Sequence, residues 1–109
     1  MRRMFEGSKF NGDISSWDVS NVKDMSGMFR STQEFNQDIG NWDVSNVSMK
    51  PSGGIDTGFD YMFFLASSFS QDLSDWCVEK ITSTPDWFAH ESNYYYEKEK
   101  HPKWGEPCN

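Results

Sequence analysis

The sequence has few basic residues. Ten lysines and arginines stand against seventeen aspartates and glutamates, which gives a formal net charge of −7 at pH 7. A basic face is the usual mark of a nucleic-acid-binding protein, so this charge disfavours that class. It equally disfavours an electrostatic hold on an anionic membrane surface. We therefore expect no nucleic-acid partner.

Long apolar runs and catalytic motifs are also missing. No run approaches the roughly 18 residues of a membrane-spanning helix, so we expect no direct membrane insertion. No signal-peptide pattern is visible. No Ser–His–Asp set, phosphate loop or glycine fingerprint is found. We expect no enzymatic activity, no catalytic residue and no cofactor.

Cysteine is scarce: Cys77 and Cys108 are the only two. In a reducing compartment they would be unrelated thiols, and in an oxidising one they could form a disulfide. With His90 and His101 they could supply four metal ligands. However, the close pairing of ligands that zinc sites show is absent, so we expect no metal. The residues by themselves do not decide between two unrelated thiols and a disulfide.

The chain repeats one phrase, at 10–22, at 35–47 and, in a degraded form, at 69–81. An apolar pair precedes each copy and follows the last one, and the spacing is about 25 residues apart from one longer step, as in leucine-rich repeats. The pairs are Met4-Phe5, Met28-Phe29, Met62-Phe63 and Trp87-Phe88. Each unit of such a protein buries its apolar side chains against its neighbours.

Two patterns predict the elements of a unit. Apolar residues at i, i+3, i+4 and i+7 in 59–66 indicate a short amphipathic helix. Short segments bounded by turn formers, at 13–15, 38–40 and 72–74, indicate strands. We therefore expect an α/β repeat fold. It would be a short leucine-rich-repeat-like solenoid of three to four units, with parallel short strands, short helices and a C-terminal cap.

The predicted organisation is a single repeat domain over residues 1–109. Proline and paired glycines mark a surface loop within the second unit. The predicted units are 1–24, 25–58 with an insertion at 48–56, 59–83 and a C-terminal cap at 84–109.

The motif MF…FNQDIxxWDVSNV, clearest at 10–22 and 35–47, resembles the BspA-like repeat family of surface proteins, which is leucine-rich-repeat-like. The Trp76-Cys77-Val78 segment and the final Trp104-Gly105-x-x-Cys108 are similar to the C-terminal cap of that family. The resemblance implies a Cys77–Cys108 disulfide, adhesion or recognition roles and no catalysis. It also implies an extracellular or cell-surface location, or another oxidising compartment.

Three columns of residues recur at one register. An aspartate column could bind Ca²⁺, but aspartates also accept backbone N–H bonds in turns, and we favour that structural role. A tryptophan column could stack on sugars, but we favour packing, with Trp17 and Trp42 interchangeable. The columns are Trp17, Trp42 and Trp76; Ile14, Ile39 and Leu73; and Asp13, Asp38 and Asp72.

Tyr94, Tyr95 and Tyr96 are consecutive, so they cannot all face inward on a regular element. At least one should be exposed, either as a contact surface or as part of a crowded cap. Asn46 begins a formal glycosylation acceptor, Asn-Val-Ser, whose use stays open.

The N-terminal end carries the functional expectation. The sequence starts within a repeat, so one face of the first unit would lack a neighbour. The residues expected at this face are Arg2, Arg3, Met4, Phe5, Phe10 and Ile14. Another protein, a further copy or upstream repeats would cover it, and a glycan is also a possible ligand.

These observations favour a non-catalytic protein-interaction or adhesion module of a surface or secreted protein. One alternative is an accessory or structural subunit, docked in a larger assembly through its uncapped N-terminal repeat. Another is a calcium-dependent or glycan-binding adhesin.

Overall fold

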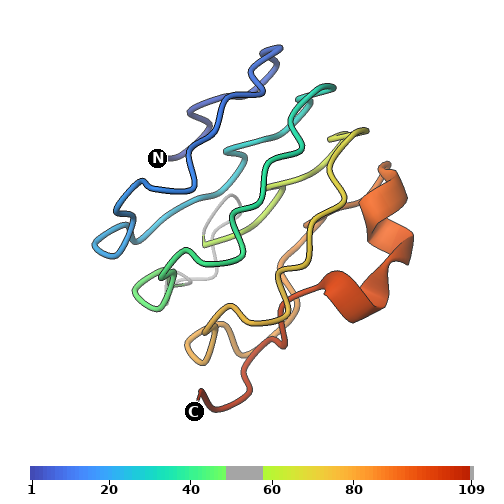
Figure 1. Cartoon of the computed structure of the whole chain (residues 1–109). Helices are drawn as coiled ribbons and strands as arrows, with labels where there is room; N and C mark the ends of the chain where they lie inside the picture. The colour runs from blue at the N-terminus through green and yellow to red at the C-terminus, as the bar shows by residue number, and fades with distance from the viewer. Residues whose placement is uncertain (49–57, 109) are drawn as a thin grey trace.

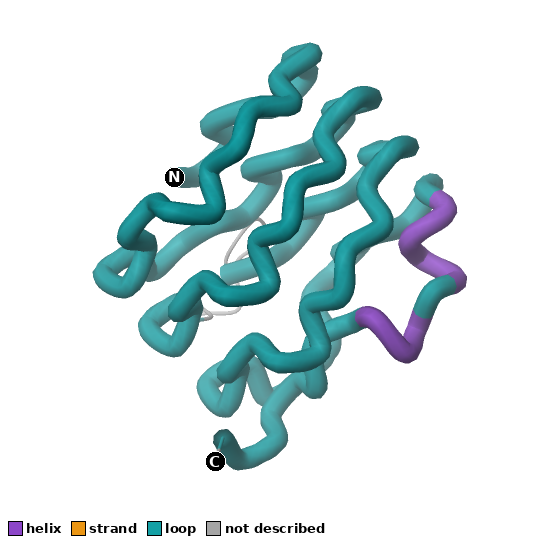
Figure 2. The backbone as a smooth tube through the Cα atoms, viewed as in Figure 1, coloured by secondary structure: helices purple, strands orange, loops and turns teal. Residues whose placement is uncertain are grey.

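The computed structural model describes residues 1–48 and 58–108. Within these residues there is no α-helix and no β-strand, and the regular elements are two short 3-10 helices, η1 (Asn93–Tyr96) and η2 (Lys98–Lys100) (Figure 2). The rest of the described chain forms coils that lie side by side from the N-terminus to the C-terminal region (Figure 1). The expected α/β solenoid of helices and parallel strands is therefore wrong. The predicted insertion lies outside the described residues except for Ser48.

Overlapping β-turns replace the expected helices. In the second coil, Met28 donates its N–H to the Met25 carbonyl at 3.2 Å. Thr32 likewise donates to the Phe29 carbonyl at 3.1 Å. These bonds span three residues, as in β-turns, and not the four of an α-helix. All four side chains are buried, because successive turns bury the same i, i+3, i+4 and i+7 positions as one face of a helix.

The N–H groups of alternate residues bond to the next coil. Gly27 donates to the Asp60 carbonyl at 2.9 Å, while its own carbonyl accepts from Arg30 in the same coil at 3.1 Å. Met28 does the reverse, because its carbonyl accepts from Phe5 of the preceding coil at 2.9 Å. A parallel β-ladder needs residues that both donate and accept between the strands. Bonds that run one way join the coils without making a sheet.

The third residue of many turns has a positive φ. Gly27 occupies this position in the second coil with φ 63°, and Arg3, Tyr61 and Trp87 occupy it in the others with φ 55°, 59° and 56°. A turn with positive φ only at this position suits glycine. A residue with a Cβ pays roughly 1–2 kcal/mol there. The large side chains at these positions are therefore retained against local strain.

The predicted strand segments are tight turns. Ser15 donates its N–H to Oδ1 of Asp13 at 2.9 Å, and Ser74 donates to Oδ1 of Asp72 at the same distance. Such a bond closes a turn around the aspartate and competes with an extended conformation. The expected strands at 13–15 and 72–74, and the one at 38–40, are absent for this reason.

Side-chain amides join neighbouring coils just before these aspartate turns. The N–H of Asn36 donates to Oδ1 of Asn11 at 2.9 Å, and the N–H of Ser70 donates to Oδ1 of Asn36 at 2.9 Å. Gln37 and Gln71 donate to the same two asparagines. The asparagines thus satisfy backbone groups that a β-ladder would otherwise pair.

Two columns of phenylalanine rings fill the core of the stacked coils. Neighbouring rings in each column lie 5.4–6.2 Å apart, and the two rings of each coil lie 4.0–4.2 Å apart. Tyr94 closes the column that contains Phe69 at its C-terminal end, where the two rings meet edge-on at 4.9 Å. The columns are Phe5, Phe29, Phe63 and Phe88, and Phe10, Phe35 and Phe69.

Candidate functional site

The two ends of the stack differ. At the C-terminal end, Tyr94 is fully buried, and its hydroxyl donates to the Lys100 carbonyl at 2.7 Å. Lys100 also accepts from the Leu73 N–H at 2.8 Å, so the chain folds back over its last coil. Burial raises the pKa of the Tyr94 hydroxyl well above its ordinary value. This end is closed by the protein itself.

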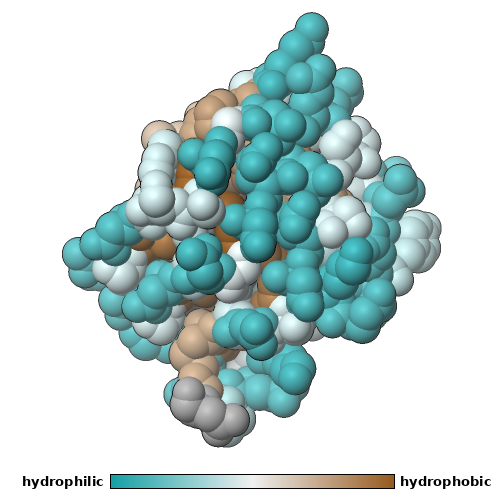
Figure 3. All heavy atoms as spheres, viewed as in Figure 1, coloured by the Kyte–Doolittle hydropathy of each residue, from teal (hydrophilic) through white to brown (hydrophobic). Residues whose placement is uncertain are grey.

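The N-terminal end exposes apolar side chains. Met4 is 51% exposed and Trp17 is 37% exposed, and Phe5 and Phe10 are half-buried against the core. We call these four residues the N-terminal face. Figure 3 shows apolar atoms at the surface on the side where Figure 1 places the N-terminus.

The backbone of the first coil offers acceptors at this face. In the second coil, the Met28 and Arg30 carbonyls accept N–H bonds from the coil before it, at 2.9 Å each. Met4 and Glu6 hold the same positions in the first coil, and within the described residues their carbonyls accept no backbone hydrogen bond. The edge thus presents carbonyl oxygens without matching N–H groups.

The structure places some residues of the N-terminal end differently from the sequence prediction. Ile14 is 2% exposed, so it belongs to the core, and the unpaired strand edge expected at 13–15 does not exist. Arg3 makes an ion pair with Glu6 of its own coil at 3.5 Å. Arg2 is exposed. Turn carbonyls, and not a strand, make this edge.

The tryptophan column lies mostly inside. Trp42 and Trp76 are 4% exposed, and their Nε1–H groups donate to the carbonyls of Ile14 and Ile39 at 3.1 and 2.9 Å. Trp17 has no earlier coil among the described residues to receive its ring, so it is not interchangeable with Trp42. Leu73 and Ile39 are fully buried.

The aspartate column caps turns. Asp38 accepts from the Gly40 N–H at 2.9 Å, as Asp13 and Asp72 do from their serines. Hydrogen bonds from Ser15 and Ser74 hold the pKa of Asp13 and Asp72 below the ordinary value. These oxygens have backbone partners, which is the structural role that the sequence favours.

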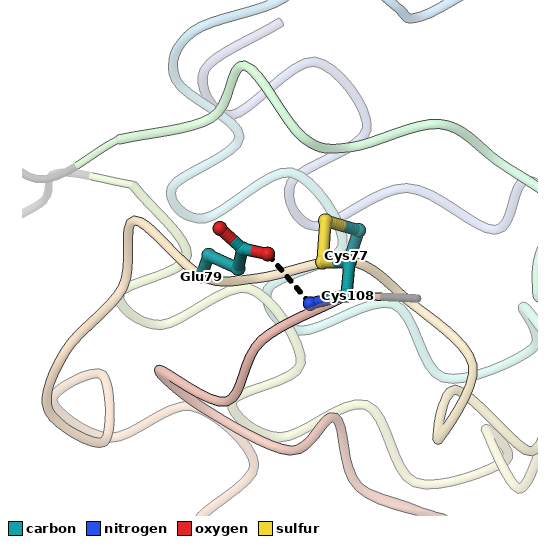
Figure 4. Close-up of side chains that lie close together, drawn as sticks. All are labelled: Cys77, Glu79 and Cys108. Atoms are coloured by element: carbon teal, nitrogen blue, oxygen red, sulfur yellow. Dashed lines mark hydrogen bonds between the residues drawn. A yellow bond between two sulfur atoms is a disulfide. The ribbon is translucent and has the colours of Figure 1, made fainter.

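The two cysteines form a disulfide, with Cα atoms 5.5 Å apart. Figure 4 shows Glu79 beside it, where its carboxylate accepts the backbone N–H of Cys108. The sulfur atoms are bonded to each other, so this group is not a ready metal site, although the three side chains lie together. Among the described residues, neither histidine joins them. Burial lowers the pKa of His101.

Asn46 has a packing role. Its Nδ2 donates to the Ser20 carbonyl at 2.6 Å, and its Oδ1 accepts from Lys80 at 3.2 Å. The three tyrosines divide as expected, because Tyr94 is buried, Tyr95 is half-buried and Tyr96 is 78% exposed.

Two features escaped the sequence reasoning. One is the asparagine ladder, which the recurrence of Asn after Phe10 and Phe35 could have indicated. The other is an outer row of rings, in which Arg30 lies 4.7 Å over Tyr61, and Trp87 stacks on Tyr61 at 6.3 Å. Tyr61 and Trp87 stand at positive-φ positions of their turns. No hydrophobic period in the sequence marks those positions.

Stacked coils define a repeat-built protein, and among the described residues the first coil presents an exposed face. The chain belongs to the family described as Mycoplasma protein of unknown function, DUF285, whose model matches residues 1–101. This match is consistent with the BspA-like resemblance, although it does not establish that specific repeat motif. No curated protein and no solved structure matches the chain.

The family match and the disulfide both fit an extracellular location and support a surface-protein module. In the part of the chain that the structure describes, no helix has the length and apolar character needed to cross a bilayer.

Proposed function

We propose that this chain is a non-catalytic recognition module of a surface or secreted protein, and that it binds another polypeptide through its N-terminal face. The observation that carries the proposal is that one edge combines exposed apolar side chains with carbonyls that accept no backbone hydrogen bond from the described part of the chain. Met4 and Trp17 supply apolar area, and the Met4 and Glu6 carbonyls supply acceptors. Buried carbonyls need donors, so the partner must bring N–H groups.

The acceptor edge selects the kind of partner. Two copies meeting face to face would set carbonyls against carbonyls, so this edge does not favour a symmetric dimer of the chain. A segment whose alternate N–H groups point one way, as in the coils themselves, would pair with the edge as the Phe5 N–H pairs with the Met28 carbonyl. Main-chain bonds would then provide affinity and the apolar side chains specificity.

The alternative of an accessory subunit uses the same face, because permanent docking would bury the same residues. The calcium-dependent adhesin has less support, since Oδ1 of each column aspartate already accepts a backbone N–H. The N-terminal face therefore remains the best-supported contact site.

Hydrogen exchange on the isolated chain tests this proposal, together with light scattering. Amides in 4–15 should exchange faster than those in 62–75, because the first coil is braced on one side only. The chain should be monomeric. A monomer in which 4–15 is as protected as 62–75 has a self-sufficient end and contradicts the proposal.

A further inference from the structure

A hollow lies away from the N-terminal face, between a coil and helix η1. It has a volume of about 270 Å³ and is lined by Ser67, Glu91, Ser92, Asn93 and Tyr96. That volume is just below the roughly 300 Å³ at which pockets for drug-sized ligands begin. The hollow suits a small ligand with many polar groups.

Tyr96 forms an open aromatic wall of this hollow. Its side chain is 78% exposed, and its ring meets Tyr95 edge-on, at 5.1 Å and 87°. Most of the Tyr96 side chain is therefore open to solvent. By contrast, Tyr94 is buried, and the Lys98 ammonium lies 3.8 Å over the Tyr95 ring. Of the three tyrosines, Tyr96 is the one available to stack on a ligand.

The polar side chains beside Tyr96 are also available. Glu91 and Asn93 are exposed, and within the described residues no hydrogen bond holds either side chain. A carboxylate accepts hydroxyl protons and an amide both donates and accepts.

The charges around the hollow disfavour an anionic ligand. Glu91 lies in its wall and the chain carries a net charge of −7, so anions are repelled. A neutral sugar meets no such repulsion, and it offers an apolar face for the ring and hydroxyls for Glu91 and Asn93.

We propose that this hollow is a binding site for a neutral saccharide. The sugar ring stacks on Tyr96, and its hydroxyls bond to Glu91 and Asn93. The site is separate from the N-terminal face and does not depend on it.

Three sugars that share one ring but differ in charge test the proposal. Saturation-transfer NMR on the full chain would use N-acetylglucosamine, glucosamine and glucuronate, with lactose as a second neutral sugar. We expect binding of at least one neutral sugar in the millimolar range. In amide correlation spectra of the chain, the sugar should change the chemical shifts of residues 91–96 and Ser67 only. Glucuronate, which is anionic, should bind more weakly than the neutral sugars. No transfer from either neutral sugar, or equal binding of glucuronate, would overturn the proposal.

Variants locate the site. Tyr96→Ala should weaken binding about tenfold, since ring stacking contributes on the order of one factor of ten. Tyr96→Phe keeps the ring and should bind nearly as the parent does. Asn93→Ala tests the polar side independently. Trp17→Ala, an exposed aromatic of the other face, is the matched control and should leave sugar binding unchanged. If Trp17→Ala abolishes binding and Tyr96→Ala does not, the site is wrongly assigned.

Discussion

Single residues of one column have different roles, because the coils around them differ. Trp42 is buried, and its indole N–H bonds to the Ile14 carbonyl of the coil before it. Trp17 holds the same place in the first coil but remains 37% exposed. The same residue in the same phrase is thus core in one copy and surface in another.

Alanine substitutions measure this difference. Trp42→Ala should lower the free energy of unfolding by about 3–5 kcal/mol, because it leaves a cavity and an unpaired carbonyl. Trp17→Ala should cost less than half as much. Urea unfolding of both variants provides the comparison. Equal losses would mean that Trp17 is also buried in solution.

Overlapping turns are the repeated element of this fold, and glycine at their third position is locally preferred. Gly27 has φ 63°, whereas Ser31, four residues later, adopts φ 60° with a side chain. The Cβ of an alanine at position 27 would lie 3.0 Å from Cγ of Arg3. Backbone strain should therefore decide the effect of substitutions here.

A pair of substitutions of opposite sign tests the strain. Gly27→Ala should destabilise the fold by about 1–2 kcal/mol, the cost of a Cβ at positive φ. Ser31→Gly should stabilise it by a few tenths to about 1 kcal/mol, since glycine relieves the strain but has more entropy in the unfolded chain. Thermal melts of the two variants check this. A stabilising Gly27→Ala would disprove the turn assignment.

The aspartate turns make stability depend on pH. Bonds from Ser20 and Ser45 lower the pKa of Asp18 and Asp43. A group with a lowered folded-state pKa contributes full stability above its unfolded pKa of about 3.9, and loses it as the pH falls through the folded value. The urea concentration at the unfolding midpoint should therefore decrease as the pH is lowered below about 4. Asp18→Asn with Asp43→Asn caps the same turns without titrating, so the midpoint should vary less with pH. An unchanged pH profile in this variant would refute the account.

The described residues form an asymmetric stack, because the last coil is covered by the C-terminal segment and the first coil exposes apolar side chains. The Cys77–Cys108 disulfide joins the tail to the last repeat across 31 residues of sequence. Within residues 1–48 and 58–108, the N-terminal coil has no disulfide and packs against one neighbouring coil. The two ends should therefore differ in their resistance to local unfolding.

Removal of the disulfide should weaken the closed end. The double variant Cys77→Ser with Cys108→Ser should be less stable by roughly 3–4 kcal/mol, the chain-entropy value for a loop of this length. Calorimetry with and without reductant measures this, and the double variant should not respond to reductant. A parent protein whose melting is insensitive to reduction would contradict the prediction.

The sequence by itself determined the repeats and the buried positions, and its resemblance to a surface-protein family indicated the cysteine pair. Phe59, Met62, Phe63 and Ala66 are all buried, as their spacing predicts. Periodicity reports which side chains face inward, because burial selects apolar residues at those positions. It does not report the backbone, and here turns and a helix bury the same positions.

Only the tertiary structure decided the elements and the two ends. Asn11 accepts a backbone N–H from Asn36, twenty-five residues away, and such a bond replaces a sheet without altering the local pattern. Likewise, Trp17 and Trp42 have the same local sequence, and one is exposed because it lacks a coil on one side. Hydrogen-bond partners and burial depend on the neighbouring coils, and a local pattern within one repeat does not contain those neighbours.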